Sequence, residues 1–412
     1  MGILVKHAAE LVTVSGFEKK SGRDMQDLGI ITDGAVVMEG DKIVDVGTTA
    51  AILSRHNERD HEVINATGKA VLPGFIDPHT HFVFGGYRAE EFGMRLEGKS
   101  YMDIMAAGGG IASTTEATRE ESFDMLYHKG VTRLDQCLRY GVTTVEGKSG
   151  YGLDHDTELK QLRVMKKLSS DHPVDVVPTF MGAHAVPKEY KGKADAYLDM
   201  LIEDVLPTVR SEMLARFVDI FCEEGVFSVE QSRRYLTAAK AMGFKLKMHA
   251  DEVISLGGAE LAAELGALSA DHLLAASELG IARMTKEGVI GVLLPTTAFC
   301  LDKPYANARR MIDHGMAVAL ATDFNPGSSF TQSIPLVMAL AALKMGMTPE
   351  EIVTASTLNA AAAVDRADMV GSIDVGKKAD LVILRYPSYR YLVYNTGQYT
   401  VEHVIKNNQL LF

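Results

Sequence analysis

The chain has 412 residues, 47% of them hydrophobic and 23% charged, which is the ordinary balance of a soluble globular protein. Its formal net charge of −12 disfavours nucleic acid and anionic membrane surfaces as main partners, because binding phosphate groups needs clustered Lys and Arg. The length exceeds one small core and allows two domains, or one large barrel with an accessory unit.

The number of cysteines and the length of apolar runs indicate the cellular compartment of the protein. Its three cysteines, Cys137, Cys222 and Cys300, are odd in number and widely separated, which does not make a disulfide framework. Residues 1–10 lack the apolar core of a signal peptide, and no run of about 18 apolar residues is present for a membrane span. We therefore expect a cytoplasmic protein with no membrane partner.

Short β-prone runs separated by Gly, Asp, Asn and Thr occupy both ends of the chain. They cover residues 3–14, 34–47 and 62–69 at one end, and residues 371–384 and 400–412 at the other. Turn-prone segments divide these runs, as expected for strands and hairpins. We predict one small β-sandwich domain built from both termini, residues 1–70 and 366–412.

Apolar strands alternate with amphipathic helices between these ends. Helical periodicity covers residues 157–168, 229–242, 256–265 and, after the cap candidate Thr348, residues 349–364. Strands are predicted at residues 71–76, 142–146, 174–180, 217–222, 245–249, 267–271, 289–294 and 317–322. About eight strands alternating with helices favour a (β/α)₈ barrel of the TIM type over an open doubly wound sheet, with residues 71–365 forming the barrel.

The first predicted barrel strand stops at two histidines, His79 and His81. On a strand, this i, i+2 spacing points both imidazoles to the same face. Pro78 interrupts the strand just before them, so the motif lies where a strand enters a loop. Imidazole is a strong zinc ligand, so the pair forms half of a metal site, although a bare His-x-His fits a loop with two surface histidines equally well.

Ligating side chains recur at the ends of other predicted strands. They are His184 after the third, His249 after the fifth, His272 after the sixth and Asp323 after the eighth. Active sites of (β/α)₈ barrels lie at the C-terminal ends of the strands, so these side chains are expected to meet. Three neutral nitrogens from His79, His81 and His249 and one carboxylate from Asp323 suit a single zinc or iron ion and leave room for water.

Other residues at these strand ends have two interpretations each. The fourth strand ends near Glu223 with no lysine that could be carboxylated to bridge two ions, which favours one metal and leaves Glu223 as a further contact. With four ligands named, His272 is assigned to hydrogen bonding of the attacked oxygen or of the water. Glu252 would hang over the same site, and fits equally well as a solvated carboxylate at a helix start. Asn325-Pro326-Gly327-Ser328 offers amides and polar side chains beside the metal, as a plain turn also would.

Longer motifs resemble the amidohydrolase superfamily over nearly the whole chain. They are Asp77-Pro78-His79-Thr80-His81-Phe82-Val83-Phe84-Gly85, Glu91-Phe92-x-x-Arg95-Leu96-x-Gly98-x-Ser100-Tyr101, Gly108-Gly109-Gly110-Ile111-x-Ser113-Thr114 with Ala117-Thr118-Arg119, Lys148-Ser149-Gly150-Tyr151-Gly152-Leu153, Gly182-Ala183-His184, His249-Ala250-Asp251-Glu252, and Ala321-Thr322-Asp323-Phe324-Asn325-Pro326-Gly327. The His-x-His segment is shared by many hydrolases and deaminases, whereas residues 91–119 are far more specific to one branch.

This resemblance implies metal-dependent hydrolysis of the cyclic amide carbon–nitrogen bond of 4-imidazolone-5-propanoate. The product would be N-formimidoyl-L-glutamate, formed in histidine degradation by attack of metal-activated water on the ring carbonyl. The resemblance implies one divalent metal, zinc or iron, per subunit of a homodimer. Asp323 would take and return the proton, His272 would steady the oxyanion, and Glu252 would assist them.

The implied substrate is a small anion, and its propanoate needs a cation. Arg88, seven residues past His81, is the candidate, because a guanidinium binds a carboxylate in a bidentate manner. The other expected substrate contacts are Tyr151, His184, Glu252, Asn325, Gly327, Ser328 and Tyr101, the last of which also fits a packing role.

Two other functions stay open from the sequence. A deaminase of nucleobases or guanidine-type compounds would use the same metal-activated water to expel ammonia, and Arg88 argues against that substrate class. A non-enzymatic, zinc-stabilised binding protein would close its metal site with four tight protein ligands, leaving no position for water.

Overall fold

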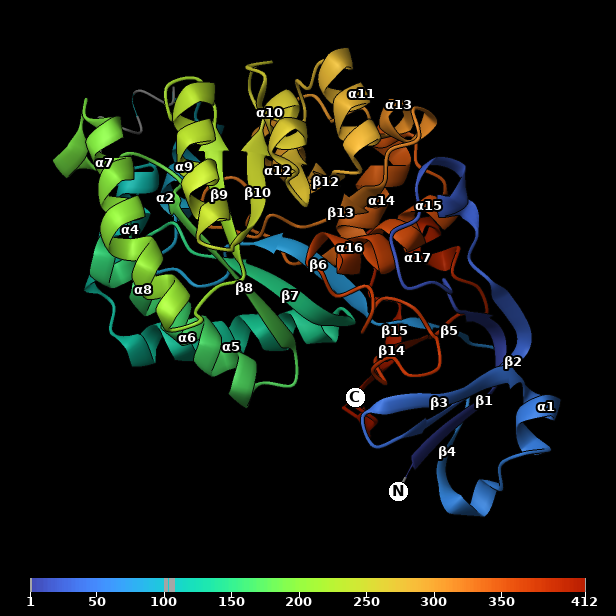
Figure 1. The fold of residues 1–412 in the computed structure, drawn as a ribbon. Helices are drawn as coiled ribbons and strands as arrows, with labels where there is room; N and C mark the ends of the chain where they lie inside the picture. The colour runs from blue at the N-terminus through green and yellow to red at the C-terminus, as the bar shows by residue number, and fades with distance from the viewer. Residues whose placement is uncertain (1, 100–102, 104–107, 412) are drawn as a thin grey trace.

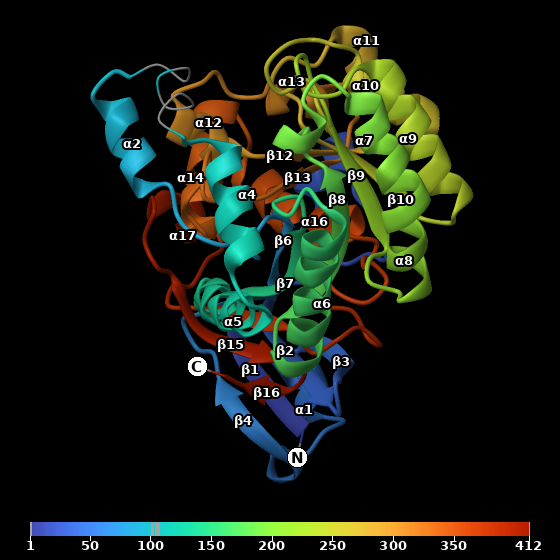
Figure 2. The same cartoon turned by 90° about the vertical axis from the view of Figure 1, so that its left-hand side faces the viewer.

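The computed structural model of the chain describes residues 2–99, 103 and 108–411. A barrel of parallel strands wrapped by helices forms the larger part, and a mixed sheet from both ends of the chain lies below it (Figure 1 and Figure 2). The first and last strands of the chain, β1 (Gly2–Val12) and β16 (Gln409–Leu410), both lie in this lower part. The predicted fold class, a (β/α)₈ barrel with a β-unit made by both termini, is confirmed.

Eight parallel strands form the barrel within the described residues, and they follow one another in chain order. They are β6 (Phe75–Thr80), β7 (Val142–Lys148), β8 (Asp175–Ala183), β9 (Phe217–Cys222), β10 (Lys245–Ala250), β11 (Ser269–His272), β12 (Ile290–Leu293) and β13 (Val318–Leu320). The end of the series returns to its start, because Thr80 forms a parallel bridge with Phe324. The Asp323 amide also donates to the His79 carbonyl at 3.0 Å, which closes the barrel.

Helices surround the barrel, and their apolar faces share one core with the strands. Those that follow the barrel strands are α2 (Ala89–Leu96), α4 (Ile111–Glu120), α5 (Phe123–Arg139), α6 (His155–Asp171), α7 (Ala194–Met200), α8 (Leu206–Ser211), α9 (Val229–Ala241), α10 (Gly258–Leu265), α11 (Glu278–Glu287), α12 (Pro295–Leu301), α13 (Ala308–Asp313), α14 (Ile334–Met345), α15 (Pro349–Ser356) and α16 (Leu358–Ala363). Within the described residues, no helix has both the length and the apolar character needed to cross a membrane.

The terminal segments join in one mixed sheet. Its strands are β1 (Gly2–Val12), β2 (Ile30–Glu39), β3 (Lys42–Thr48), β4 (His61–Asn65), β5 (Ala70–Pro73), β14 (Leu381–Leu384), β15 (Val401–Lys406) and β16 (Gln409–Leu410), with the short helices α1 (Thr49–Leu53) and α17 (Tyr391–Tyr394) attached. Ile43 of β3 and Ile405 of β15, from opposite ends of this sheet, share one apolar core, so the sheet folds over on itself. Where the two domains divide as folding units stays a prediction.

Two predicted elements are divided in the structure. The strand expected at residues 71–76 is β5 and β6, with Gly74 between them. A side chain at Gly74 would bring its Cβ to 2.4 Å from Thr143 Oγ1, so the crossing from one sheet to the other requires glycine. The helix expected at residues 349–364 begins at its predicted cap, Thr348, but stops at Thr357, whose hydroxyl donates to the Val353 carbonyl at 2.6 Å. Such local side-chain bonds compete with helix continuation.

A buried carboxyl, Asp77 of β6, ties the first strand to the segment after the last. It accepts from the Thr322 amide at 3.0 Å and from the Thr322 hydroxyl at 2.6 Å, across 245 residues of sequence. Burial raises the pKa of Asp77 to about 7. The folded chain therefore keeps a proton on Asp77 at a pH where the unfolded chain has lost it.

We expect Asp77 to make the chelator-treated protein less stable as pH rises. Its contribution is fully present below about pH 4, the ordinary Asp pKa, and is lost as pH passes its folded pKa near 7. The Asp77→Asn variant has no carboxyl group at this position and lacks this pH-dependent contribution. Its free energy of unfolding in urea should therefore fall less between pH 4 and pH 8 than that of the parent protein. The difference between the two decreases should be up to ~4 kcal/mol.

The matched control is Asp156→Asn, because the Asp156 side chain is 97% exposed. This variant should keep the parent's pH dependence. A pH dependence in Asp77→Asn as steep as in the parent would contradict a protonated, buried Asp77.

Candidate active site

The predicted site residues on the barrel strands meet at one mouth of the barrel. They are His79 within β6 and His81 just after it, His184 just after β8, His249 within β10, His272 at the end of β11, and Asp323 shortly after β13. Apart from His184, each is at most 3% exposed. The site is therefore assembled from strand ends, which hold their side chains more rigidly than long loops do.

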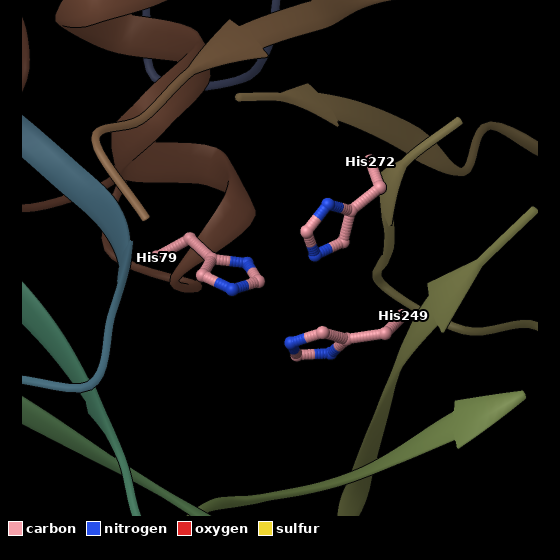
Figure 3. A group of neighbouring side chains, drawn as sticks. All are labelled: His79, His249 and His272. Carbon is pink, nitrogen blue, oxygen red and sulfur yellow. The ribbon is translucent and has the colours of Figure 1, made fainter. Parts of the chain in front are cut away.

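Three imidazoles, from His79, His249 and His272, point toward one another (Figure 3). One ring nitrogen of each lies within 4.8 Å of the other two. Around His79 there is a second such group with His81 and Asp323, in which Asp323 Oδ1 lies 3.4 Å from His79 Nε2 and 3.9 Å from His81 Nε2. The four ligands expected from the sequence thus fall into two groups that share His79, one with His81 and Asp323 and the other with His249, and His272 joins the second group.

The imidazoles fit a metal ion because their other nitrogens are already engaged. His79 Nδ1 lies 2.6 Å from Asp271 Oδ2, and His249 Nδ1 lies 3.1 Å from Asp219 Oδ2. A carboxylate at Nδ1 fixes the proton there and leaves the Nε2 lone pair free. Both Nε2 atoms are buried and have no hydrogen-bond partner within the described chain. Unpaired buried acceptors are costly, and a metal ion that prefers imidazole would satisfy them.

The charge state of these rings also suits a metal. Burial lowers the pKa of His79, His81 and His249 well below the ordinary histidine value. Each ring is therefore neutral at pH 7, and neutral imidazole is the form that ligates metals.

A cluster of buried charges beneath the imidazoles was missed by the sequence reasoning. Lys148 Nζ lies 3.0 Å from Glu146 Oε1, 2.7 Å from Asp219 Oδ2 and 3.3 Å from Asp271 Oδ2. Lys247 pairs with the other oxygen of Glu146, and all five side chains are 0% exposed. The available signal was the single charged residues within apolar strands, at positions that alternate toward the barrel interior.

Two carboxyl groups at the barrel mouth bind protons unusually well. Burial raises the pKa of Asp323 to about 7 and that of Glu252 to about 8. Thr297 Oγ1 donates to Asp323 Oδ2 at 2.6 Å, and Glu252 Oε2 lies 3.6 Å from His272 Nδ1. Burial lowers the pKa of His272 to about 4, so this ring is neutral at pH 7. Groups with pKa values near the working pH suit proton transfer.

Arg88, at the start of α2, reaches the loop that follows Asp323. A Cβ at Gly327 would lie 2.2 Å from Arg88 Nη1, so glycine is required for this approach. Arg88 Nε donates to Thr114 Oγ1 at 2.7 Å. Within the described residues, its Nη1 and Nη2 groups have no hydrogen-bond acceptor, which leaves the two-pronged end of the guanidinium available for an anion.

Asn325 is engaged within its own loop. Its Oδ1 accepts from the amides of Gly327 and Ser328, both at 2.8 Å. Its Nδ2 donates to the Asp323 carbonyl at 2.6 Å and to Ser328 Oγ at 2.8 Å. The Asn325 side chain therefore shapes the loop beside Asp323. Its expected contact with substrate, and that of Ser328, stay predictions.

Tyr151 and His184 lie beside His81. The His184 ring stacks on His81 with ring centroids 5.0 Å apart and planes 16° apart. Tyr151 meets both rings edge-on, at 5.6 Å from His81 and 5.3 Å from His184. The loop carrying Tyr151 is fixed by Glu158, which accepts the backbone amides of Gly150, Gly152 and Leu153.

Two further residues, Glu223 and Tyr101, were predicted from the sequence to contact the metal or the substrate. Glu223 accepts the amides of Val253 and Ile254 at 2.9 and 3.4 Å, so it supports the loop next to Glu252. The metal-binding group formed by His79, His81 and Asp323 does not include it. Tyr101 lies outside the described residues, and its expected role stays a prediction.

Comparison with known proteins identifies the family. Residues 70–411 match the amidohydrolase family, and residues 34–56 match the imidazolonepropionase-like composite domain of bacteria. The chain therefore belongs to the amidohydrolase family and is a hydrolase. It is 58% identical over 410 residues to imidazolonepropionase from Clostridium tetani, with 100% of this chain and 98% of that protein covered. The imidazolonepropionase from Parabacteroides distasonis is 57% identical over 408 residues, with 99% and 98% covered. Within the amidohydrolases, the chain belongs to the imidazolonepropionases.

Solved structures share the same fold at low identity. A triazine hydrolase variant has a TM-score of 0.78 and 17% identity, covering 100% of this chain and 94% of that one. Atrazine chlorohydrolase from Arthrobacter aurescens, complexed with zinc, has a TM-score of 0.74 and 16% identity, covering 99% and 95%. The likeness spans the barrel and the terminal sheet together.

We expect the chelator-treated protein to bind one zinc ion per chain. The His79→Ala variant should bind it far more weakly, because His79 belongs to two of the possible ligand groups. The loss of zinc affinity should exceed the roughly 10–100-fold loss that follows removal of a residue hydrogen-bonded to a metal ligand. Titration against a chromophoric chelator measures both stoichiometry and affinity. The control is His128→Ala, an exposed histidine on α5, and equal affinity of the two variants would contradict the site.

Proposed function

We propose that this site hydrolyses the cyclic amide carbon–nitrogen bond of 4-imidazolone-5-propanoate to give N-formimidoyl-L-glutamate, a step of histidine degradation. The observation that carries this proposal is the set of unpartnered imidazole nitrogens beside Asp323, with the available guanidinium of Arg88 at the same mouth. The relatives named imidazolonepropionase, which match over the whole chain, support the same reaction.

The metal would be held by His79, His81, His249 and Asp323, and zinc and iron both suit this ligand set. When bound, such an ion supplies Lewis acidity and lowers the pKa of a coordinated water to ~7. Asp323 takes the proton of the attacking water and returns it to the leaving ring nitrogen. Thr297 holds Asp323 Oδ2, so Oδ1 stays directed at the imidazoles.

His272 and Glu252 act on the other side of the ring carbonyl. The neutral His272 ring borders the metal-binding imidazoles, where it donates a hydrogen bond to the developing oxyanion. Glu252 Oε2 lies 3.6 Å from His272 Nδ1, which places this carboxyl group beside the ring without a hydrogen bond to it. Its raised pKa keeps a proton on it near neutral pH, so Glu252 also serves as a hydrogen-bond donor to the substrate.

Substrate orientation would come from the opposite rim. The propanoate binds the free Nη groups of Arg88, next to Gly327 and Ser328. Tyr151 and His184 flank His81 and hold the imidazolone ring. The expected homodimer and cytoplasmic location stay predictions.

We expect Asp323→Asn to lose nearly all activity, by a factor of at least ~10²–10⁴ in kcat, because the amide cannot take the proton from water. Loss of 4-imidazolone-5-propanoate in the zinc-loaded variant and parent measures this. Zinc content of both proteins must be determined in parallel, since Asp323 is also a proposed ligand.

Turnover of Asp323→Asn comparable to the parent would overturn the mechanism. A parent enzyme that releases ammonia from nucleobases and leaves 4-imidazolone-5-propanoate unchanged would instead establish the deaminase alternative.

We expect Arg88→Ala to weaken substrate binding by about 2–4 kcal/mol, because a charge-assisted pair in a partly buried pocket is lost. The effect should appear mainly in KM. An analogue that lacks the propanoate carboxylate should bind the parent enzyme more weakly than the substrate does, by the same free energy. The variant should bind this analogue almost as well as the parent does. Arg139→Ala is the control, since Arg139 lies at the end of α5. An unchanged KM for Arg88→Ala would remove Arg88 from the site.

A further inference from the structure

Lys148 connects the two carboxylates that support the metal-binding imidazoles. Its ammonium lies 2.7 Å from Asp219 Oδ2 and 3.3 Å from Asp271 Oδ2. The same Asp219 oxygen lies 3.1 Å from His249 Nδ1, and the same Asp271 oxygen lies 2.6 Å from His79 Nδ1. One cation therefore shares its two acceptor oxygens with two imidazoles that come from different strands.

Asp219, His249 and Asp271 form a group with the spacing of a metal site, their ligand atoms lying within 4.8 Å of one another. Lys148 Nζ lies within 3.3 Å of both carboxylates of this group, so a positive charge is already present there. A metal ion in this position would have to displace the ammonium.

The ammonium stays charged in this setting. Burial alone lowers the pKa of Lys148, but Asp219, Glu146 and Asp271 together raise it above the ordinary lysine value. The cluster contains two positive side chains, Lys148 and Lys247, and three negative ones, which sum formally to −1. A further cation is accommodated on the far side of the imidazoles, at their Nε2 atoms, where the site has unpaired acceptors.

We propose that Lys148 is a positioning residue that takes the place of a second metal ion. Its ammonium fixes Asp219 and Asp271 so that both accept from Nδ1–H groups, and His249 and His79 then present Nε2 to a single metal. This inference rests on the proposed metal centre. The ion pairs of Lys148 are with carboxylates and not with the proposed metal ligands, so it positions the imidazoles through Asp219 and Asp271.

The test compares two buried lysines. Zinc affinity and stoichiometry are measured by chelator competition for the parent, Lys148→Met and Lys247→Met. Lys247 is the matched control, because it is equally buried but pairs with Glu146 and, at 3.5 Å, with the Pro78 carbonyl, and not with the imidazole-bound carboxylates. Glu146 keeps Lys148 as its partner in Lys247→Met. We expect zinc affinity to fall about 10-fold or more in Lys148→Met, the scale seen when outer partners of ligands are lost, and to change less than threefold in Lys247→Met.

A second variant covers the case in which Lys148→Met does not fold. Lys148→Gln keeps a donor for the two carboxylates but removes the charge, and it should show the same loss of affinity to a smaller degree. The visible absorption spectrum of the cobalt-substituted proteins gives an independent reading. It should shift in the Lys148 variants, since the ligand orientation changes, and stay parent-like in Lys247→Met.

The possible results are distinguishable. Failure of the parent to bind zinc at one equivalent would contradict the proposed metal centre itself. Parent-like affinity and cobalt spectrum in both Lys148 variants, or equal losses in the Lys148 and Lys247 variants, would overturn the positioning role alone. A second zinc equivalent bound by Lys148→Met and not by the parent would support it.

Discussion

The pairing of Lys148 with Asp219 and Asp271, within a cluster of five buried charged side chains, is the constraint on which the site depends. Taking each charge out of water costs several kcal/mol, so the cluster is tolerated only when every member has a partner at short distance. The partners come from four strands: Glu146 and Lys148 from β7, Asp219 from β9, Lys247 from β10 and Asp271 from β11. The strand register must therefore bring these positions to one level, and the same register fixes the imidazoles of His79 and His249 directly above.

The contacts that close the barrel also position the side chains of the site. The Asp323 amide that donates to the His79 carbonyl joins the last strand to the first and also places the Asp323 carboxyl beside the His79 ring. Asp323 and His272 adopt positive φ values of 53° and 75°, and Asp251, before Glu252, has φ 49°. Non-glycine residues in this region cost on the order of 1–3 kcal/mol each. Surrounding bonds hold this strain, for example the four backbone amides that Asp251 accepts after β10.

The sequence predicted features that depend on local pattern, and missed those that depend on pairing between distant segments. Apolar runs of strand length gave all the barrel strands, and the strand-end rule then brought His79, His249 and Asp323 to one mouth. The division at Gly74 was missed because it results from a close approach to Thr143 on another strand. Lys148 was missed as a site component because the two carboxylates that link it to the imidazoles are distant in sequence. Asp219 lies 71 residues away and Asp271 lies farther. The hydrogen bonds of the Asn325 amide within its own loop were also missed, because the sequence does not show which groups the loop brings within reach of that amide.

We propose that buried carboxylates hold the imidazoles by Nδ1 and leave Nε2 for one metal ion. A crystal structure of the zinc-loaded protein, with anomalous data collected at the zinc edge, tests it most directly. We expect one anomalous peak per chain, within coordination distance of the Nε2 atoms of His79 and His249, with Lys148 still between Asp219 and Asp271. A peak bound through Nδ1, a second peak at the Lys148 position, or a peak only elsewhere on the protein would contradict it.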